Sequence, residues 1–349
     1  MRVVVTGATG NIGTALLSRL ADEPAVEAVV GVARRRPGWR PDKVQWIQAD
    51  VARDDLAPLF RGASAVVHLA WLIQPSHRPL VTWGANVHGT ENVLQAVHAA
   101  GVPGFVYSSS VGAYSPGPKD RPVDESWPTD GWPTAAYCRE KAYVERLLDR
   151  FERERPGHRV VRIRPAFVFQ RHSASQQRRL FAGPAVPGRL ATPRAIPVVP
   201  DFPGLRLQVV HAADVAEAFR LALVRQVSGA FNVAADPPVD AHVLAEHLGA
   251  HVVPVPRQLV RAGLATAWGL HVTPSSPYLF DAAVRLPVMD TGRARRELGW
   301  TPAHTALDAV DEFLAGLREN AGFDTPPLRS DAGGPLRYKE ILTGVGVHP

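Results

Sequence analysis

Cysteine is nearly absent from this chain of 349 residues, in which Cys138 stands alone. A single cysteine excludes an internal disulfide framework and any metal site built from several thiolates. No apolar run approaches the roughly 20 residues that a membrane-spanning helix requires. No charged segment followed by an apolar one opens the sequence, so we expect no signal peptide. These absences favour a cytoplasmic protein without a membrane partner.

Lysine is also scarce, occurring only at positions 43, 119, 141 and 339, while lysine and arginine together number 39. The net charge of +6 therefore comes from scattered arginines. They form no block that could follow a phosphate backbone, so we expect no nucleic-acid partner. Hydrophobic residues make up 46% and charged residues 21%, which is ordinary for a globular protein.

Strand-like and helix-like stretches alternate through the first half of the chain. Helical apolar spacing is found in 11–23 and 86–101, and each of these stretches is flanked by apolar strands. Such alternation predicts an α/β fold, a doubly wound parallel Rossmann sheet covered by helices on both faces. The predicted strands are "RVVVTG" at 2–7, "VEAVVGVAR" at 26–34, "VQWIQADV" at 44–51, "SAVVHLAW" at 64–71, "GFVYSSSVGAY" at 104–114 and "HRVVRIRPAFVF" at 158–169.

A glycine-rich turn joins the first predicted strand to the first helix. Gly7, Gly10 and Gly13 have the spacing G-x-x-G-x-x-G. Glycines at this junction let the backbone approach a pyrophosphate closely, and the helix N-terminus presents free N–H groups to its charge. An ordinary βα turn is the alternative, but the position between a first strand and a first helix is the one that dinucleotide binding requires.

The end of the second strand bears on which dinucleotide is bound. An acidic residue there would bind ribose hydroxyls, but this chain has Ala33 followed by Arg34 and Arg35. A guanidinium can hold a 2′-phosphate through two hydrogen bonds, so we expect NADP, with NAD possible. A solvated basic loop is the alternative. Asp50 could accept the adenine amino group beside Val51, or could instead cap a helix.

Proton-handling residues are predicted at 110, 137 and 141. Tyr137 and Lys141 are four residues apart and share a helix face. A nearby ammonium would favour the phenolate and lower the ordinary pKa of tyrosine, about 10. Ser110 lies at a strand end, where it could donate to a substrate oxygen, with Ser108 and Ser109 as rivals. A surface tyrosine packed over a lysine stem is the alternative.

Together these motifs resemble the extended short-chain dehydrogenase/reductase family, which contains nucleotide-sugar epimerases and dehydratases. The resemblance covers residues 1 to about 318 and is carried by "TGATGNIG", "ADV" at 49–51, "HLAW" at 68–71, "NVHGTENVL" at 86–94, "YSSSVGAY", "YCREK" and "RRELGW".

The resemblance implies that Tyr137 exchanges the hydroxyl proton while hydride passes between substrate carbon and nicotinamide. It also implies that Asn86 supports the lysine through the helix it kinks, and that no metal is needed. The expected catalytic residues are Ser110, Tyr137, Lys141 and Asn86. The expected cofactor-binding residues are Gly7, Thr9, Gly10, Asn11, Ile12, Gly13, Arg34, Arg35, Asp50, Val51, Leu69, Ala70, Tyr137, Lys141 and Pro165.

The match weakens where substrate would be recognised. UDP-galactose epimerases carry an asparagine that contacts the nucleotide diphosphate where this chain has Phe167, and an arginine where it has Leu207. Neighbouring Arg206 could substitute for that arginine. The absence of the asparagine and of the arginine argues against a UDP-sugar as substrate and is compatible with a less charged one.

The resulting hypothesis is an NADP(H)-dependent oxidoreductase that transfers hydride between nicotinamide and a carbonyl or secondary alcohol of a small organic substrate. An NAD(P)-dependent epimerase or dehydratase with transient oxidation is the first alternative, and a non-catalytic dinucleotide-binding regulator is the second. A homodimer is possible. We expect a dinucleotide domain at 1–169 plus about 207–236, a smaller, mainly C-terminal substrate domain at about 170–206 plus 237–318, and a loose tail at 319–349.

Overall fold

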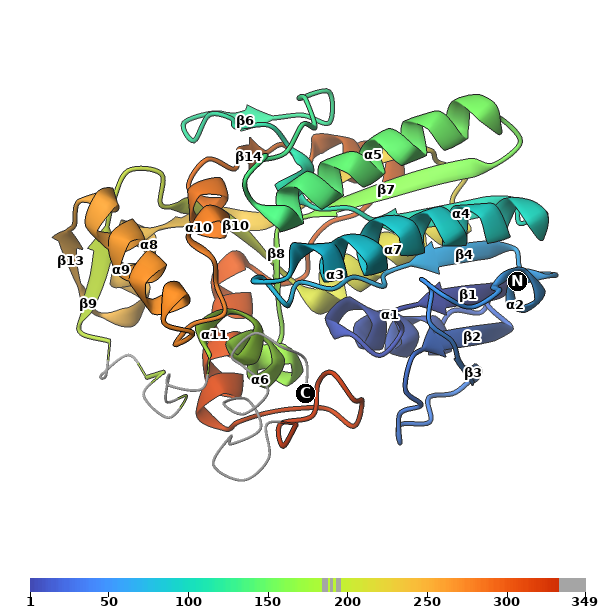
Figure 1. The fold of residues 1–349 in the computed structure, drawn as a ribbon, viewed down its shortest axis with the longest axis horizontal. Helices are drawn as coiled ribbons and strands as arrows, with labels where there is room; N and C mark the ends of the chain where they lie inside the picture. The colour runs from blue at the N-terminus through green and yellow to red at the C-terminus, as the bar shows by residue number, and fades with distance from the viewer. Residues whose placement is uncertain (184–187, 189–190, 193–195, 333–349) are drawn as a thin grey trace.

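A parallel seven-stranded sheet forms the centre of the protein (Figure 1). The structure, a computed structural model, describes residues 1–183, 188, 191–192 and 196–332. Every neighbouring pair of strands in this sheet is parallel. In order across the sheet, the strands are β11 (Gly229–Val233), β7 (Arg159–Pro165), β5 (Gly104–Ser108), β4 (Ala65–His68), β1 (Arg2–Thr6), β2 (Ala28–Ala33) and β3 (Val44–Gln48).

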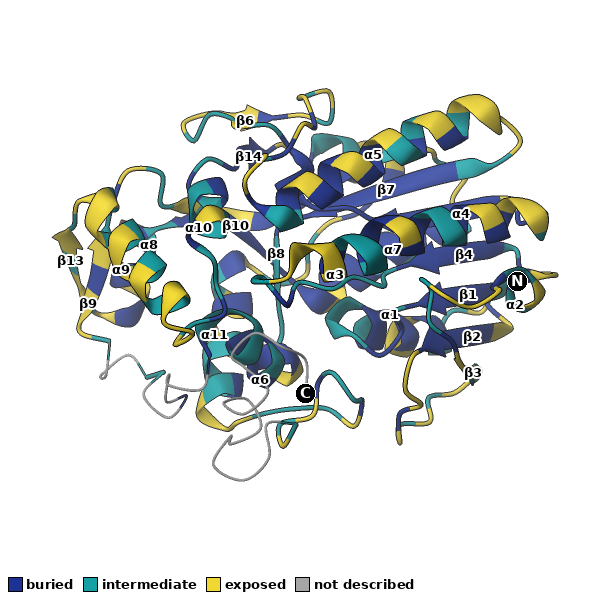
Figure 2. Cartoon of the chain, in the orientation of Figure 1, coloured by how far each residue is buried: buried dark blue, intermediate teal, exposed yellow. Residues whose placement is uncertain are grey.

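Helices cover both faces of the sheet, because side chains alternate along each strand. Val3 and Val5 enter the hydrophobic core on one face, and Val4 enters the core on the other. The inner strands of the sheet are buried, whereas the edge strand β3 is only partly buried and the outer sides of the helices are exposed (Figure 2). No helix in the described part of the chain is long and apolar enough to cross a bilayer. The first face is covered by α1 (Asn11–Ala21) and α7 (Ala212–Val224), and the second by α2 (Ala57–Phe60), α4 (Gly89–Ala99) and α5 (Ala136–Glu154).

Most of the smaller sheets and short helices lie beyond one end of the strands of the central sheet (Figure 1). They come mainly from the C-terminal half, so the predicted fold class is confirmed. The small sheets pair β8 (Phe167–Phe169) and β12 (Ala235–Asp240) with β10 (Arg206–His211), β9 (Val198–Asp201) with β13 (His251–Pro254), and β6 (Pro122–Val123) with β14 (Val288–Met289). The remaining α-helices are α3 (Pro79–Trp83), α6 (Ala174–Gln177), α8 (Ala241–Leu248), α9 (Arg257–Gly269), α10 (Pro277–Ala283) and α11 (Ala306–Arg318).

The segment that follows α11 packs against the rest of the protein. Thr325 and Leu328 are fully buried. The Thr325 hydroxyl donates a hydrogen bond to the backbone oxygen of Thr9, at 2.9 Å, within the glycine-rich turn. The expectation of a loose tail at 319–349 is therefore wrong for its first part, because buried side chains anchor it. Residues 333–349 lie outside the described part of the chain.

Candidate active site

The glycine-rich turn brings three backbone segments into close contact. A Cβ on Gly7, whose φ is +70°, would lie 2.5 Å from the backbone nitrogen of Ala70, and a Cβ on Gly13 would lie 2.5 Å from Gly7 O. Gly10 precedes α1 and supplies no side-chain cap. The first N–H groups of the helix thus remain available to an anion. This cradle fits the pyrophosphate of a dinucleotide.

Arginine follows the second strand at the rim of the same cavity. β2 ends at Ala33, so no carboxylate occupies the position that would bind ribose hydroxyls. Arg34 lines the cavity, whereas Arg35 is not among its lining residues. Both side chains are exposed. Of these two predicted cofactor-binding residues, the structure thus brings Arg34 but not Arg35 to the cavity.

Asp50 and Val51, which follow β3, also line the cavity. The Asp50 carboxylate accepts a hydrogen bond from the backbone nitrogen of Ala52, at 3.0 Å. Asp50 thus caps the local turn through one of its two carboxylate oxygens, Oδ1. Arg53 also lines the cavity, although sequence reasoning did not select it, because a single arginine after a strand end carries no distinctive signal.

Tyr137 lies in α5 with its ring against the segment that follows β5. A Cβ on Gly112 would lie 2.8 Å from Cε1 of the Tyr137 ring, so the glycine makes room for the phenol. Burial raises the pKa of Tyr137 to about 12, and a hydrogen bond with the Ser110 side chain opposes that rise. Ser110 Oγ also accepts from the backbone nitrogen of Gly112, at 3.0 Å. The two predicted proton-handling hydroxyls are thus neighbours.

Lys141 lies deeper than Tyr137 and bonds to strand β5. Its Nζ donates to Ser108 O at 2.7 Å and to Tyr107 Oη at 3.3 Å. It also lies 3.5 Å from the centroid of the Trp71 ring but 5.9 Å from that of Tyr137. Burial lowers the pKa of Lys141 well below its ordinary value. The expectation that its ammonium lowers the pKa of Tyr137 is therefore wrong here, since burial controls both groups.

Asn86 joins the loop after β4 to α5. It lies in a π-helical stretch, Gly84–His88, between α3 and α4. Its side chain accepts from Leu72 N at 2.7 Å and donates to Glu140 Oε2 at 2.6 Å. Glu140 also accepts from the Thr82 hydroxyl, at 2.6 Å. Asn86 thus holds the residue next to Lys141 rather than Lys141 itself, a link that sequence reasoning missed because Glu140 resembles any helix glutamate.

One cavity of about 1470 Å³ collects nearly all the predicted residues. Arg35 is the exception. The cavity runs past the carboxyl ends of β1 and β4, where the strand order reverses and where ligands bind in such sheets. The predicted residues that line it are Gly7, Thr9, Gly10, Asn11, Ile12, Gly13, Arg34, Asp50, Val51, Leu69, Ala70, Asn86, Ser110, Tyr137, Lys141 and Pro165.

Comparison with known families agrees with this geometry. A profile described as the NAD dependent epimerase/dehydratase family matches residues 3–234. The chain belongs to this family. The expected membership of the epimerase/dehydratase group is thereby confirmed.

Individual relatives of this epimerase/dehydratase family member differ in length and description. An uncharacterized protein of Mycobacterium tuberculosis is 29% identical over 326 residues, and the chain spans only 31% of that protein's length. A ketoreductase of Stigmatella aurantiaca, named for a farnesyl-dihydroquinoline oxide, is 30% identical, over 89% of this chain and 95% of the relative. The solved UDP-glucose 4-epimerase of Thermus thermophilus with NAD superposes with a TM-score of 0.67 at 22% identity, covering 91% of this chain and 99% of the other.

Proposed function

We propose that the protein is an NADP(H)-dependent oxidoreductase acting on a ketone or secondary alcohol. The observation that carries this proposal is the convergence of Ser110, Tyr137 and Lys141 on the cavity that also holds the glycine cradle. The Stigmatella relative, described as a ketoreductase, supports the reductase interpretation.

In the proposed reduction, a nicotinamide cofactor bound in this cavity would provide the hydride that the carbonyl carbon accepts. Tyr137 is protonated at neutral pH, because burial raises its pKa to about 12, and gives its proton to the carbonyl oxygen. The Ser110 hydroxyl donates to that oxygen as negative charge develops. Lys141 donates to the Ser108 oxygen and lines the same cavity, so its remaining N–H donors would hold the ribose hydroxyls of a bound cofactor.

Preference for NADP over NAD is supported by Arg34 at the cavity rim and by the absence of a carboxylate at Ala33. Changing Arg34→Ala should weaken NADPH binding at least tenfold and leave NADH binding unchanged, since only NADPH carries the 2′-phosphate. Arg36→Ala is the matched control, because Arg36 is exposed in the same loop and is not among the residues lining the cavity. Equal loss for both cofactors in Arg34→Ala would contradict the preference.

An NAD-dependent epimerase or dehydratase is the second candidate. The fold similarity to UDP-glucose 4-epimerase and the family description favour it. Such an enzyme oxidises and then reduces its substrate within one turnover, which regenerates the cofactor. The cofactor can therefore stay bound from one turnover to the next. Purification without added nucleotide, followed by denaturation and mass analysis, separates the two: stoichiometric NAD⁺ supports the epimerase or dehydratase, and empty protein that binds NADPH supports the reductase.

The test of the proposed function is Tyr137→Phe. This change removes one hydroxyl and preserves the ring that packs on Gly112. We expect ketone reduction to fall 100-fold or more, the usual scale for a general acid, with NADPH affinity unchanged. Retention of full turnover would refute the role of Tyr137. Loss of NADPH binding with an unchanged circular dichroism spectrum would assign the Tyr137 hydroxyl to cofactor binding instead.

A further inference from the structure

The cavity has two chemically different ends. Its dinucleotide end is formed by the turns after β1, β2 and β3 and is rich in backbone N–H groups and arginine. Its other end lies among the small sheets and the C-terminal helices. That end is mainly aliphatic and aromatic, with walls that include Phe167, Phe181, Leu207, Leu264, Phe280 and Leu314.

Charge is sparse at this apolar end. Among the described lining residues that follow Pro165, two are charged, Arg178 and Asp240. The Asp240 carboxylate accepts from two backbone N–H groups at the start of α8, at 3.1 and 3.0 Å. Arg178 Nη1 donates to Gly183 O at 2.9 Å. Both charges therefore have protein partners, whereas a sugar nucleotide needs cations or free N–H groups for its diphosphate.

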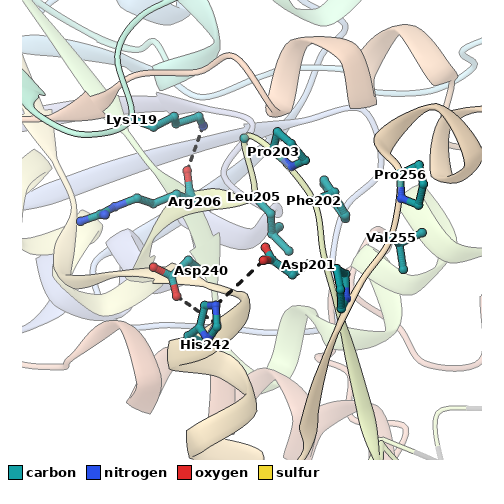
Figure 3. A pocket seen from close by; sticks show the side chains of 12 residues that line it. Lys119, Asp201, Phe202, Pro203, Leu205, Arg206, Asp240, His242, Val255 and Pro256 are labelled. Carbon is teal, nitrogen blue, oxygen red and sulfur yellow. Dashed lines mark hydrogen bonds and ion pairs between the residues drawn. The ribbon is translucent and has the colours of Figure 1, made fainter.

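At two positions in the wall, this chain has apolar residues where UDP-galactose epimerases carry an asparagine and an arginine. Phe167 in β8 and Leu207 in β10 both line the cavity. Arg206 does not substitute for a cation there. It is exposed, it precedes Leu207 on an alternating strand, and it lines a separate, smaller pocket in which Lys119 Nζ donates to its backbone oxygen at 2.9 Å (Figure 3).

We infer that the substrate is a lipid-sized hydrocarbon bearing one ketone or secondary alcohol, with its oxygen at Ser110 and Tyr137 and its body in the apolar end. This inference rests on the proposed function. Pockets for drug-sized ligands measure roughly 300–1,000 Å³, so a cavity of about 1470 Å³ has room for a dinucleotide and a sizeable second molecule. In reduction, hydride from NADPH forms the new C–H bond and the Tyr137 proton completes the hydroxyl, leaving an alcohol and NADP⁺.

A series of methyl ketones from butanone to undecanone tests this inference by the initial rate of NADPH oxidation. We expect KM to fall about fourfold for each added methylene, the ratio that corresponds to ~0.8 kcal/mol per buried CH₂, until the apolar end is filled. A steroid ketone in a parallel assay shows whether fused rings or linear chains are preferred. UDP-glucose with either oxidised cofactor should give no turnover.

Failure of the inference and failure of the proposed function give different results. Equal KM values along the series, or turnover of UDP-glucose without release of cofactor, would overturn the hydrocarbon inference. If no ketone or alcohol reacts with either cofactor, the proposed function fails. Binding then decides the inference alone: tryptophan fluorescence must report a steroid ketone binding at least tenfold more tightly than UDP, and the opposite order refutes it.

Neighbouring residues on one strand provide matched variants. Leu207→Gln places a polar side chain in the apolar wall, whereas Arg206→Gln makes the same replacement at an exposed neighbour that does not line this cavity. We expect Leu207→Gln to raise KM for undecanone at least tenfold, with KM for butanone and the Kd for NADPH unchanged, and Arg206→Gln to change none of these. Unchanged KM for undecanone in Leu207→Gln, with NADPH binding intact, would contradict the inference.

Discussion

Glu145 is fully buried in α5 beneath the candidate site, and its replacement by glutamine tests how buried charges support that site. Oε1 accepts from the Ser109 hydroxyl at 2.6 Å and from Arg164 Nε at 2.9 Å. Oε2 accepts from Arg164 Nη2 at 3.0 Å and from Arg162 Nη1 at 2.9 Å. Four donors thus surround one carboxylate.

For the Glu145 carboxylate, the favourable interactions with these donors exceed the cost of burying its charge. Burial alone would raise the pKa of Glu145, but the Arg164 and Arg162 guanidinium groups, together with hydrogen bonds from Arg164 and Ser109, lower it from 4.5 to about 2. At about 1.4 kcal/mol for each pKa unit, the lowering corresponds to about 3 kcal/mol of folding stability at neutral pH. Because the folded-state pKa is the lower one, this stability is present above pH 4.5 and is lost as the pH falls toward 2.

The assay is urea unfolding of the wild type and of Glu145→Gln. Glutamine keeps the volume but not the charge, so at pH 7 we expect its free energy of unfolding to be lower by about 3 kcal/mol. The difference should persist at pH 5 and shrink below pH 4.5. Glu154→Gln, which breaks only an exposed ion pair with Arg150 on the same helix, is the control and should lower the free energy of unfolding far less, because exposed ion pairs contribute little to stability. Equal stability of wild type and Glu145→Gln at pH 7 would refute the electrostatic argument.

Two further predictions concern Tyr137. Since burial raises its pKa to about 12, ketone reduction should have a constant kcat from pH 6 to pH 9, whereas alcohol oxidation, which needs the phenolate, should speed up about tenfold per pH unit; a plateau in the oxidation rate above pH 8 would contradict this. Gly112→Ala would place a Cβ 2.8 Å from the Tyr137 ring and should lower kcat about 10- to 100-fold with NADPH affinity retained, as steady-state kinetics and a cofactor titration would show. An unchanged kcat would mean that the phenol position is not critical.

Local patterns explain what could be predicted from the sequence. The glycine turn is a contiguous motif between a strand and a helix, and the spacing of Tyr137 and Lys141 places both on one helix face. The carboxyl ends of parallel strands lie at the same side of a sheet, where ligands bind, and Ser110 was placed at such a strand end. The cavity that Ser110, Tyr137 and Lys141 share with the turn agrees with that reasoning.

Competition between backbone partners was harder to predict. The apolar run at 158–169 reads as one strand, but β7 ends at Pro165 and β8 begins at Phe167. Ala166 N still donates to Val233 O, at 2.9 Å, whereas β8 pairs with β10 in another sheet. Proline lacks an N–H donor, so pairing is already weakened where the chain leaves the central sheet.

Contacts between segments that are distant in the sequence could not be predicted either. The segment after α11 is polar and rich in proline and glycine, a composition that predicts a loose tail. Its Thr325 nevertheless bonds Thr9, which lies 316 residues earlier. Phe323 packs edge-on against Trp39, with ring centroids 5.0 Å apart. A few buried side chains suffice to anchor such a segment, and no local periodicity reveals them.

The apolar end of the cavity illustrates why substrate class requires a structure. Apolar residues at helical spacing normally predict a face buried in the protein core. Helix α9, however, has no buried residue, and its Leu264 lines the cavity. A short helix usually draws its stability from packing an apolar face. If the substrate is the hydrocarbon inferred above, it would supply that packing, and Leu264 would form part of the wall that binds it.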